Sequence, residues 1–279
     1  MSLKKKRRNF SDINPLFYAI SFHKEVIKRN LKDFFSKEKF ASRIEKEKLP
    51  NIVSSHSSNI IRKGKGIDPV LQENKAVNLK LASSRINGVV IRPGETFSFW
   101  KMVGKATRKK GYKEGRIISG NKLKPGVGGG LCNLGNTINW LILHSPMEIT
   151  ELHTHSDALD PSAERNRIPF SSGTSVSYNY IDYRFKNNTD QSVQLFVWCE
   201  DGQLKAELRS EEEFPWKYEL VEEDHHFRKN GDKYYRNSRI YRNTVEKATE
   251  RLMDRKLVWN NRSMVMYDYD LIPEELIRE

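Results

Sequence analysis

The chain has 279 residues, of which 37% are hydrophobic and 10% aromatic. This length and composition are sufficient for a buried core and exclude a wholly disordered protein. The 49 Lys and Arg residues exceed the 36 Asp and Glu residues and give a net charge of +13. Such an excess can bind an anionic partner, but we favour a solvated basic tail and a solvated helix face. Since the sequence has no DNA- or RNA-binding signature, we expect that this partner is not a nucleic acid.

The segment 1–49 is predicted to form a basic tail and an amphipathic helix. Five consecutive cations stand at 4–8, and Asn14 followed by Pro15 is typical of a helix start. Apolar residues then recur at helical spacing to about Lys39. These residues are Leu16, Ile20, Ile27, Leu31 and Phe34. Such a stripe docks on the protein's own core or lies on an anionic membrane surface, and we favour the core.

Export and disulfide signals are weak in this sequence. No apolar stretch of about 7–15 residues follows the cations, as a signal peptide requires, and no run reaches the ~18 apolar residues of a membrane-spanning helix. The two cysteines, Cys132 and Cys199, are too few for a disulfide framework. These features predict a cytoplasmic protein with reduced thiols.

The remaining residues, 50–279, are predicted to form one α+β domain. An irregular, serine-rich segment over 50–67 precedes a helix over 69–86, and a glycine-rich loop over 104–130 leads into a central helix over 131–144. Farther on, apolar and polar residues alternate, and Asn-Gly or Asp-Gly pairs separate several of the alternating segments. This pattern predicts an antiparallel β meander after the helices, which makes the fold class α+β.

The glycine-rich loop and the start of the central helix are the most concentrated candidate for chemistry. Gly128, Gly129 and Gly130 allow the backbone to approach a ligand closely. Cys132 follows at the predicted helix start, where unpaired amide groups and the helix dipole lower a thiol pKa and favour the nucleophilic thiolate. The same amide groups can donate hydrogen bonds to an oxyanion.

A cysteine nucleophile needs a base, and two histidines follow about twenty residues later. His153, His155 and Asp157 alternate along a predicted strand, so their side chains share one face. We predict that His155 deprotonates Cys132 while a carboxylate orients the imidazole, with Asp182 as a more distant orienting candidate. His153 is the alternative base.

Two other interpretations of these residues stay open. The thiol, the two imidazoles and the carboxylate are all ligand types for zinc, but their spacing matches no standard zinc pattern. We therefore predict neither a metal nor another cofactor. A lone cysteine is also often a small buried hydrophobe, and glycines before a helix often form a turn, so each residue has a structural interpretation.

An ordered set of motifs resembles the VanW family. The motifs are 93–99 (PGETFSF), 103–104 (VG), 111–112 (GY), 128–132 (GGGLC), 153–156 (HTHS) and 178–185 (YNYIDYRF). The resemblance runs from about Phe40 to the C-terminus. It implies an accessory role beside the vancomycin-resistance enzymes that rebuild peptidoglycan precursors ending in D-Ala–D-Lac, with no assigned activity. Broader relatives usually have glutamine after the family cysteine, where this chain has the shorter Asn133.

Three functions therefore stay open, and whether the chain is an enzyme is undecided by the sequence. The first is a cysteine enzyme that acts on a peptide or acyl group of an envelope precursor through Cys132 and His155. The second is a non-catalytic module that binds an anionic cell-wall precursor through the glycine loop, Asn133, Lys122 and Lys124. The third is a basic protein that docks on another resistance protein, with weak contact to an anionic membrane surface. A histidine nitrogen within hydrogen-bond reach of the Cys132 sulfur would favour the first.

Overall fold

A computed structural model of the chain describes residues 15–61, 68–119, 122–154, 157–158, 174–178 and 180–278. The described residues form four α-helices, α1 (Pro15–Phe35), α2 (Pro69–Ile86), α3 (Phe99–Val103) and α4 (Leu131–Leu143). Short 3-10 helices are η2 (Arg108–Lys110), η3 (Tyr269–Leu271) and η4 (Glu274–Leu276). In this part of the chain, every helix is too short or too polar to cross a membrane.

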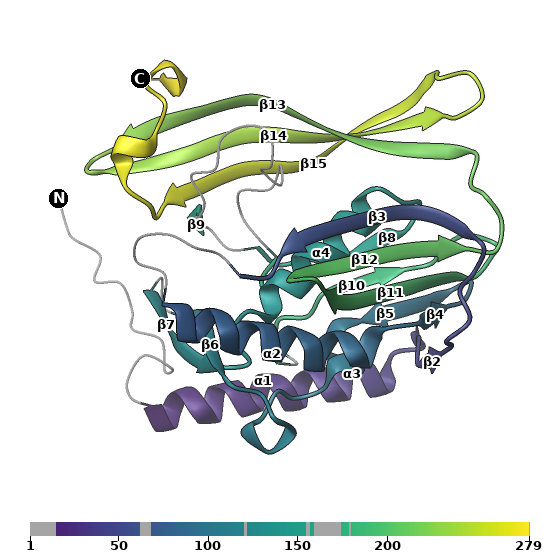
Figure 1. The fold of residues 1–279 in the computed structure, drawn as a ribbon, viewed down its shortest axis with the longest axis horizontal. Helices are drawn as coiled ribbons and strands as arrows, with labels where there is room; N and C mark the ends of the chain where they lie inside the picture. The colour runs from purple at the N-terminus through teal and green to yellow at the C-terminus, as the bar shows by residue number, and fades with distance from the viewer. Residues whose placement is uncertain are drawn as a thin grey trace.

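Much of the core lies against a five-stranded antiparallel sheet with the order β2-β4-β11-β12-β3. Its strands are β2 (Arg43–Ile44), β3 (Asn51–Asn59), β4 (Val89–Ile91), β11 (Val193–Glu200) and β12 (Gln203–Ser210). Helix α2 packs on β11, while α4 packs on β3 and β12 (Figure 1). Both helices therefore cover parts of this sheet.

Alternation along β12 explains which side chains of this strand are buried. Leu204, Ala206 and Leu208 are buried, whereas Lys205 and Glu207 between them are only partly covered. Successive side chains of a strand point to opposite faces, so the apolar set lies in the core and the charged set on the other face. The sheet thus combines a helix-covered face with a polar face.

A smaller sheet with the order β1-β5-β10-β8 completes the body of the molecule. Its strands are β1 (Lys39–Phe40), β5 (Glu95–Ser98), β8 (Glu148–Glu151) and β10 (Arg184–Lys186). Phe97 of β5 and Phe185 of β10 are fully buried, and their rings stack with centroids 4.9 Å apart. A hairpin of β6 (Glu114–Ser119) and β7 (Lys122–Val127) then leads into α4.

The C-terminal strands form a separate layer, seen at the top of Figure 1. The order of this sheet is β16-β13-β14-β15-β9, from β9 (Asp157–Ala158), β13 (Trp216–Asn230), β14 (Lys233–Glu246), β15 (Leu252–Val265) and β16 (Ile277–Arg278). The three long strands are antiparallel neighbours, and the short β9 and β16 pair in parallel at the edges. Phe227, Val265 and Ile272 form its own small apolar cluster.

The α+β class and the C-terminal antiparallel meander are confirmed, and so are the three long predicted helices, α1, α2 and α4. Helix α2 begins at Pro69 because Asp68 caps it, with Asp68 Oδ1 accepting a hydrogen bond from Val70 N at 2.8 Å. Helix α4 begins after Gly130, whose φ of +97° suits glycine. Strands β1 and β2, which precede residue 50, pair with β5 and β4.

Two predictions for the first sixty residues are wrong. The serine-rich segment contains the nine-residue strand β3, because pairing with β12 satisfies its backbone groups despite its weak strand composition. The apolar stripe of α1 does not dock on the core: Ile20, Ile27 and Leu31 are exposed, as is Phe34. Contacts of the opposite face of the helix decide its orientation.

Candidate functional site

Cys132 lies in the first turn of α4, as the sequence predicts, but its thiol has no lowered pKa. Burial raises the pKa of the Cys132 thiol, and hydrogen bonds from the backbone of Val176 and of Cys132 itself offset this shift only in part. Desolvation disfavours the charged thiolate and here exceeds the effect of the nearby amides. The predicted lowering of the pKa is therefore wrong. Burial also raises the pKa of Cys199.

Residues 174–176 cover α4 close to the thiol. A Cβ atom added to Gly135 would lie 3.2 Å from Thr174 Cγ2 and 3.5 Å from Val176 Cγ1, so the missing side chain allows this close approach. The Thr174 amide also donates a hydrogen bond to Asn136 Oδ1. These contacts hold residues 174–176 against α4, where the backbone of Val176 hydrogen-bonds the Cys132 thiol.

The backbone of His153 lies next to residues 174–176, but its imidazole ring contacts another residue. Ser175 N donates to His153 O at 2.7 Å, and Thr154 pairs with Thr174. The His153 ring is about half exposed, with Nε2 3.1 Å from Glu151 Oε1. Among the described residues, no histidine nitrogen is hydrogen-bonded to the Cys132 thiol. His155 and the Asp157 side chain lie outside the described residues, so the pairing of Cys132 with His155 stays a prediction.

Glu151 connects His153 to helix α1. Its carboxylate accepts a bidentate pair from Arg29, at 2.5 and 2.6 Å, and a hydrogen bond from the Asp182 amide at 3.2 Å. Burial alone would raise the Glu151 pKa, but the Arg29 guanidinium holds that pKa below its usual range. The carboxylate partner of His153 is therefore a charged group that also anchors α1.

Asp182 is fully buried, and none of its hydrogen-bond partners among the described residues is a histidine. Oδ2 accepts from Ser98 Oγ at 2.5 Å and from Arg184 Nε at 2.7 Å, while Oδ1 accepts from the Trp100 and Tyr183 amides at 3.1 and 2.9 Å. Both oxygens are thus engaged. These contacts indicate that Asp182 fixes the start of α3 and the Arg184 side chain, which is a structural role that the sequence did not suggest.

The glycine loop approaches the protein's own backbone. A Cβ atom on Gly129 would lie 2.1 Å from the carbonyl carbon of Gly115, and one on Gly130 would lie 2.1 Å from Lys75 Cγ. Asn78 of α2 links the two backbone segments in contact, since its Nδ2 donates to Lys113 O and Gly129 O at 3.0 and 2.9 Å. Internal packing therefore explains the need for glycine at 129 and 130, while positive φ explains Gly128.

The other predicted binding residues lie near this loop. Asn133 N donates to Gly130 O at 2.9 Å, so this amide is already engaged within the protein. Lys124 is exposed on β7, and the side chain of Lys122, on the same strand, lies outside the described set. Within the described residues, no three His, Cys, Asp or Glu side chains lie together as a metal site would require. Ligand binding by these residues stays a prediction.

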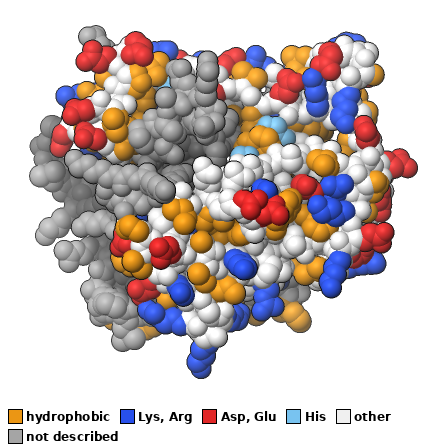
Figure 2. Space-filling model, viewed as in Figure 1, with side chains coloured by type: hydrophobic (Ala, Val, Ile, Leu, Met, Phe, Trp, Pro, Cys, Tyr) orange, Lys and Arg blue, Asp and Glu red, His pale blue; other side chains and the backbone are white. Residues whose placement is uncertain are grey.

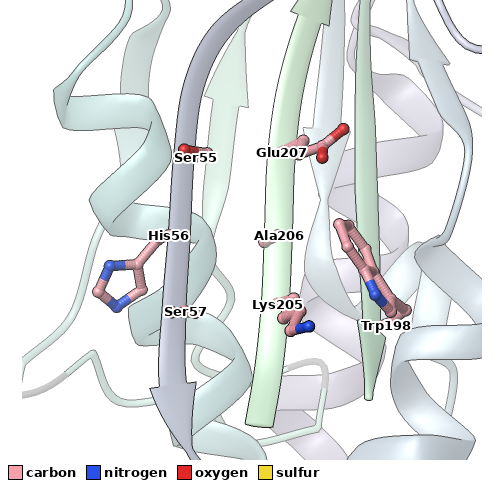
Figure 3. Close-up of a pocket in the computed structure, with 7 residues that line it drawn as sticks. All are labelled: Ser55, His56, Ser57, Trp198, Lys205, Ala206 and Glu207. Carbon is pink, nitrogen blue, oxygen red and sulfur yellow. The ribbon is translucent and has the colours of Figure 1, made fainter. Parts of the chain in front are cut away.

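A surface groove of about 420 Å³ lies on the polar face of the five-stranded sheet. Its lining residues are Ser55, His56, Ser57, Trp198, Lys205, Ala206 and Glu207. Figure 3 shows Trp198 from β11 beside Lys205 and Glu207 from β12, whereas the His56 ring points to the helix side of β3. No motif in the sequence indicates this groove, although the alternation along β12 predicts which charged side chains share a face.

Two histidines and a tryptophan stack on the other side of β3. The His56 and Trp140 ring centroids are 4.7 Å apart, and those of Trp140 and His144 are 3.7 Å apart. Figure 2 shows histidine atoms among hydrophobic side chains on the face that it draws. Burial lowers the pKa of both histidines, and the positive charge of Arg242 lowers that of His144 further. Within the described residues, the buried Nε2 of His56 has no hydrogen-bond partner.

We expect the free energy of unfolding to fall as the pH is lowered from about 7.5 to about 5. Below the ordinary histidine pKa of 6.5, the unfolded chain binds protons that His56 and His144 resist in the folded protein. The stability that these two histidines contribute is therefore present above pH 6.5 and is lost at lower pH. Urea unfolding at several pH values measures this slope. The double variant His56→Gln, His144→Gln should flatten it, and the exposed His23→Gln should not; an unchanged slope in the double variant would contradict the assignment.

Comparisons with known proteins bear on the same residues. The family described as "VanW like protein" matches residues 74–209, which include Cys132, His153 and Asp182. Vancomycin B-type resistance protein VanW of Enterococcus faecalis is 29% identical over 228 residues, covering 82% of each chain. Uncharacterized protein YoaR of Bacillus subtilis is 31% identical over 123 residues, which are 44% of this chain and 39% of YoaR. No solved structure matches the chain. The similarity across most of the E. faecalis protein agrees with the motifs in the sequence, and residues 74–209 of the chain match the VanW family.

Proposed function

We propose that this protein is a non-catalytic accessory protein of vancomycin resistance that binds an anionic cell-wall precursor. The surroundings of Cys132 are the observation that carries this proposal. Burial raises the thiol pKa, and backbone groups of Val176 and Cys132 hydrogen-bond the sulfur. A thiol that stays protonated near pH 7 is a poor nucleophile. In this proposal, Cys132 is a structural residue that packs the start of α4 against Val176.

The groove on the polar face of the five-stranded sheet is the binding surface in this proposal. Its Trp198 ring offers an apolar surface, while Ser55 and Ser57 are exposed and offer hydroxyl groups. Lys205 supplies a cation in the groove, where its Nζ lies 2.7 Å from Glu200 Oε2. Lys48 adds a second cation, 5.1 Å from the Trp198 ring centroid and paired with Glu207 Oε2 at 3.1 Å. An aromatic surface with convergent polar and cationic groups suits a ligand that combines sugar, peptide and anionic parts.

The similarity to the E. faecalis protein supports a setting in vancomycin resistance, since that relative is named for B-type resistance. An accessory protein in such a setting has its natural ligand among the precursors that the resistance enzymes alter. We therefore choose a soluble peptidoglycan precursor ending in D-Ala–D-Lac as the probe.

Binding of this probe should be saturable and should leave the precursor chemically unchanged. Titration calorimetry gives the Kd, and mass spectrometry of the mixture detects any product. We expect Trp198→Ala and Lys205→Ala each to weaken binding at least about tenfold, as truncation of a central contact typically does. Trp216→Ala and Lys247→Ala, which change the C-terminal layer and the turn after β14, are the matched controls and should bind as the wild type does.

Cys132→Ala separates the binding module from the cysteine enzyme. Our proposal predicts an unchanged Kd for this variant and slow labelling of Cys132 by iodoacetamide near pH 7, at a rate comparable to that of Cys199. Fast labelling of Cys132, or a product that forms with the wild type and not with Cys132→Ala, would establish the enzyme instead. Equal affinity of the groove variants and the wild type would rule out the groove.

A further inference from the structure

Helix α1 turns charged residues toward the protein and apolar residues toward solvent. It lies along the outer, lower edge of the molecule in Figure 1. A surface helix of a globular protein usually has the reverse orientation, with an apolar stripe on the core and charges outside. In α1, polar contacts must therefore hold the inner face, and the apolar stripe is available to another surface.

Two bidentate ion pairs hold the inner face of α1. Arg29 donates to both oxygens of Glu151, and Asp33 accepts from both terminal nitrogens of Arg184 at 2.8 Å. Phe22 adds a ring contact to Tyr180, with centroids 6.4 Å apart. Bidentate pairs with low exposure fix geometry well, so the rotation of the helix about its axis is determined by these contacts.

The outer face of α1 carries the apolar stripe. The stripe residues are three, four or seven positions apart, so their side chains fall on one side of a helix with 3.6 residues per turn. Their exposed fractions are 50% for Ile20, 59% for Ile27, 52% for Leu31 and 80% for Phe34. Phe35, 76% exposed, lies beside Phe34 at the end of the helix, with ring centroids 5.3 Å apart. So many large apolar side chains aligned on one exposed face indicate an interaction surface.

The charges beside the stripe indicate the chemistry of its partner. Lys24, Lys28 and Lys32 are exposed along one flank of the stripe, whereas Glu25 is partly covered and Asp33 is buried. The segment 4–8 adds five cations just before the helix in the sequence. A second copy of this chain would bring lysines against lysines, which repel each other. An anionic bilayer instead receives the apolar stripe and neutralises the lysines.

We propose that α1 lies flat in the surface of an anionic lipid bilayer and attaches the protein there reversibly. Its 21 residues make a helix about 31 Å long. The stripe residues enter the boundary between headgroups and acyl chains, while Lys24, Lys28 and Lys32 contact lipid phosphates. The ion pairs of the inner face keep the stripe exposed before binding, so the helix needs no rearrangement to attach.

Vesicle sedimentation with the full chain tests this proposal. The wild type should bind phosphatidylcholine vesicles that contain phosphatidylglycerol, and raised salt or pure phosphatidylcholine should weaken the binding. The stripe variant carries Ile20→Ser, Ile27→Ser, Leu31→Ser and Phe34→Ser, and we expect its binding to fall at least tenfold. Its melting temperature should stay close to that of the wild type, because the replaced side chains face outward. The charge variant Lys24→Gln, Lys28→Gln, Lys32→Gln should lose most of the preference for phosphatidylglycerol.

Matched controls place the same changes elsewhere on the surface. One control replaces the exposed apolar residues Ile52, Leu252, Met253 and Leu257 with serine, and the other replaces Lys233, Lys247 and Lys256 with glutamine. Both should bind vesicles as the wild type does. Equal binding of the stripe variant and the wild type would overturn the proposal. A wild-type dimer that becomes monomeric in the stripe variant during sedimentation velocity, without vesicle binding, would assign the stripe to a second copy instead.

Discussion

Replacement of Arg184 by methionine is expected to lower the free energy of unfolding by about 3–5 kcal/mol, the typical effect of breaking a buried ion pair from one side. The Arg184 side chain is 6% exposed, and its partners Asp33 and Asp182 are 4% and 0% exposed. Its Nε donates to Asp182 Oδ2 at 2.7 Å, while its terminal nitrogens bond Asp33. Removal of the guanidinium leaves the Asp182 carboxylate without its cation and leaves Asp33 with Lys101 alone, 3.3 Å away.

The pH dependence of this variant distinguishes lost charge pairing from lost packing. In the wild type, burial acts to raise the Asp33 pKa, but Arg184 holds that pKa below its ordinary value. In Arg184→Met, the Asp33 carboxylate can reduce the penalty by binding a proton. The difference in unfolding free energy between variant and wild type should therefore shrink as the pH falls toward about 4. A loss of packing alone would leave this difference constant.

Arg108→Met is the matched control for the Arg184 experiment. The Arg108 side chain is 69% exposed and pairs with Glu114, which is 46% exposed. Exposed pairs contribute little, so the control should change stability by less than about 1 kcal/mol. Guanidinium unfolding curves measure both variants. Equal effects of the two substitutions would show that the buried network around Arg184 is no more important than a surface pair.

Replacement of Gly129 by alanine is expected to destabilise the protein by about 3 kcal/mol or more, at the upper end of what overpacking usually costs. The new Cβ atom would lie 2.1 Å from the Gly115 carbonyl carbon and 2.2 Å from its oxygen. Both are backbone atoms, so no side chain can rotate away. Relief requires β6 and the loop before α4 to separate, which also strains the hydrogen bonds from Asn78 to Lys113 O and Gly129 O.

Gly94→Ala is the control for the Gly129 experiment. Gly94 has a φ of +78°, and a Cβ atom there would meet nothing within 4 Å. Alanine at Gly94 should therefore cost only the strain of a left-handed backbone conformation, about 1–2 kcal/mol of stability. Thermal and chemical unfolding of the two variants separate steric overlap from backbone strain. A smaller loss for Gly129→Ala than for Gly94→Ala would contradict the close contact between Gly129 and Gly115.

Local signals in the sequence determine much of the secondary structure. Asp68 and Pro69 start α2 because a cap and a first-turn proline act within one helical turn, and Gly130 marks the start of α4 for the same reason. The alternation along β12 determines which of its side chains are buried, since a strand has a period of two. The family motifs are likewise contiguous in the sequence. Each of these features depends on residues that are close together in the chain.

The tertiary structure decides the features that depend on distant partners. Hydrophobic periodicity identifies the stripe of α1 but not the side that it faces, because Arg29 and Asp33 are held by Glu151 and Arg184, which are 122 and 151 residues away. A helix start predicts a lowered thiol pKa at Cys132, yet burial in the folded protein raises that pKa by more than the hydrogen bond from the distant Val176 backbone lowers it. Desolvation and buried ion pairing act between chain segments that meet only in the folded protein, so no local pattern contains them.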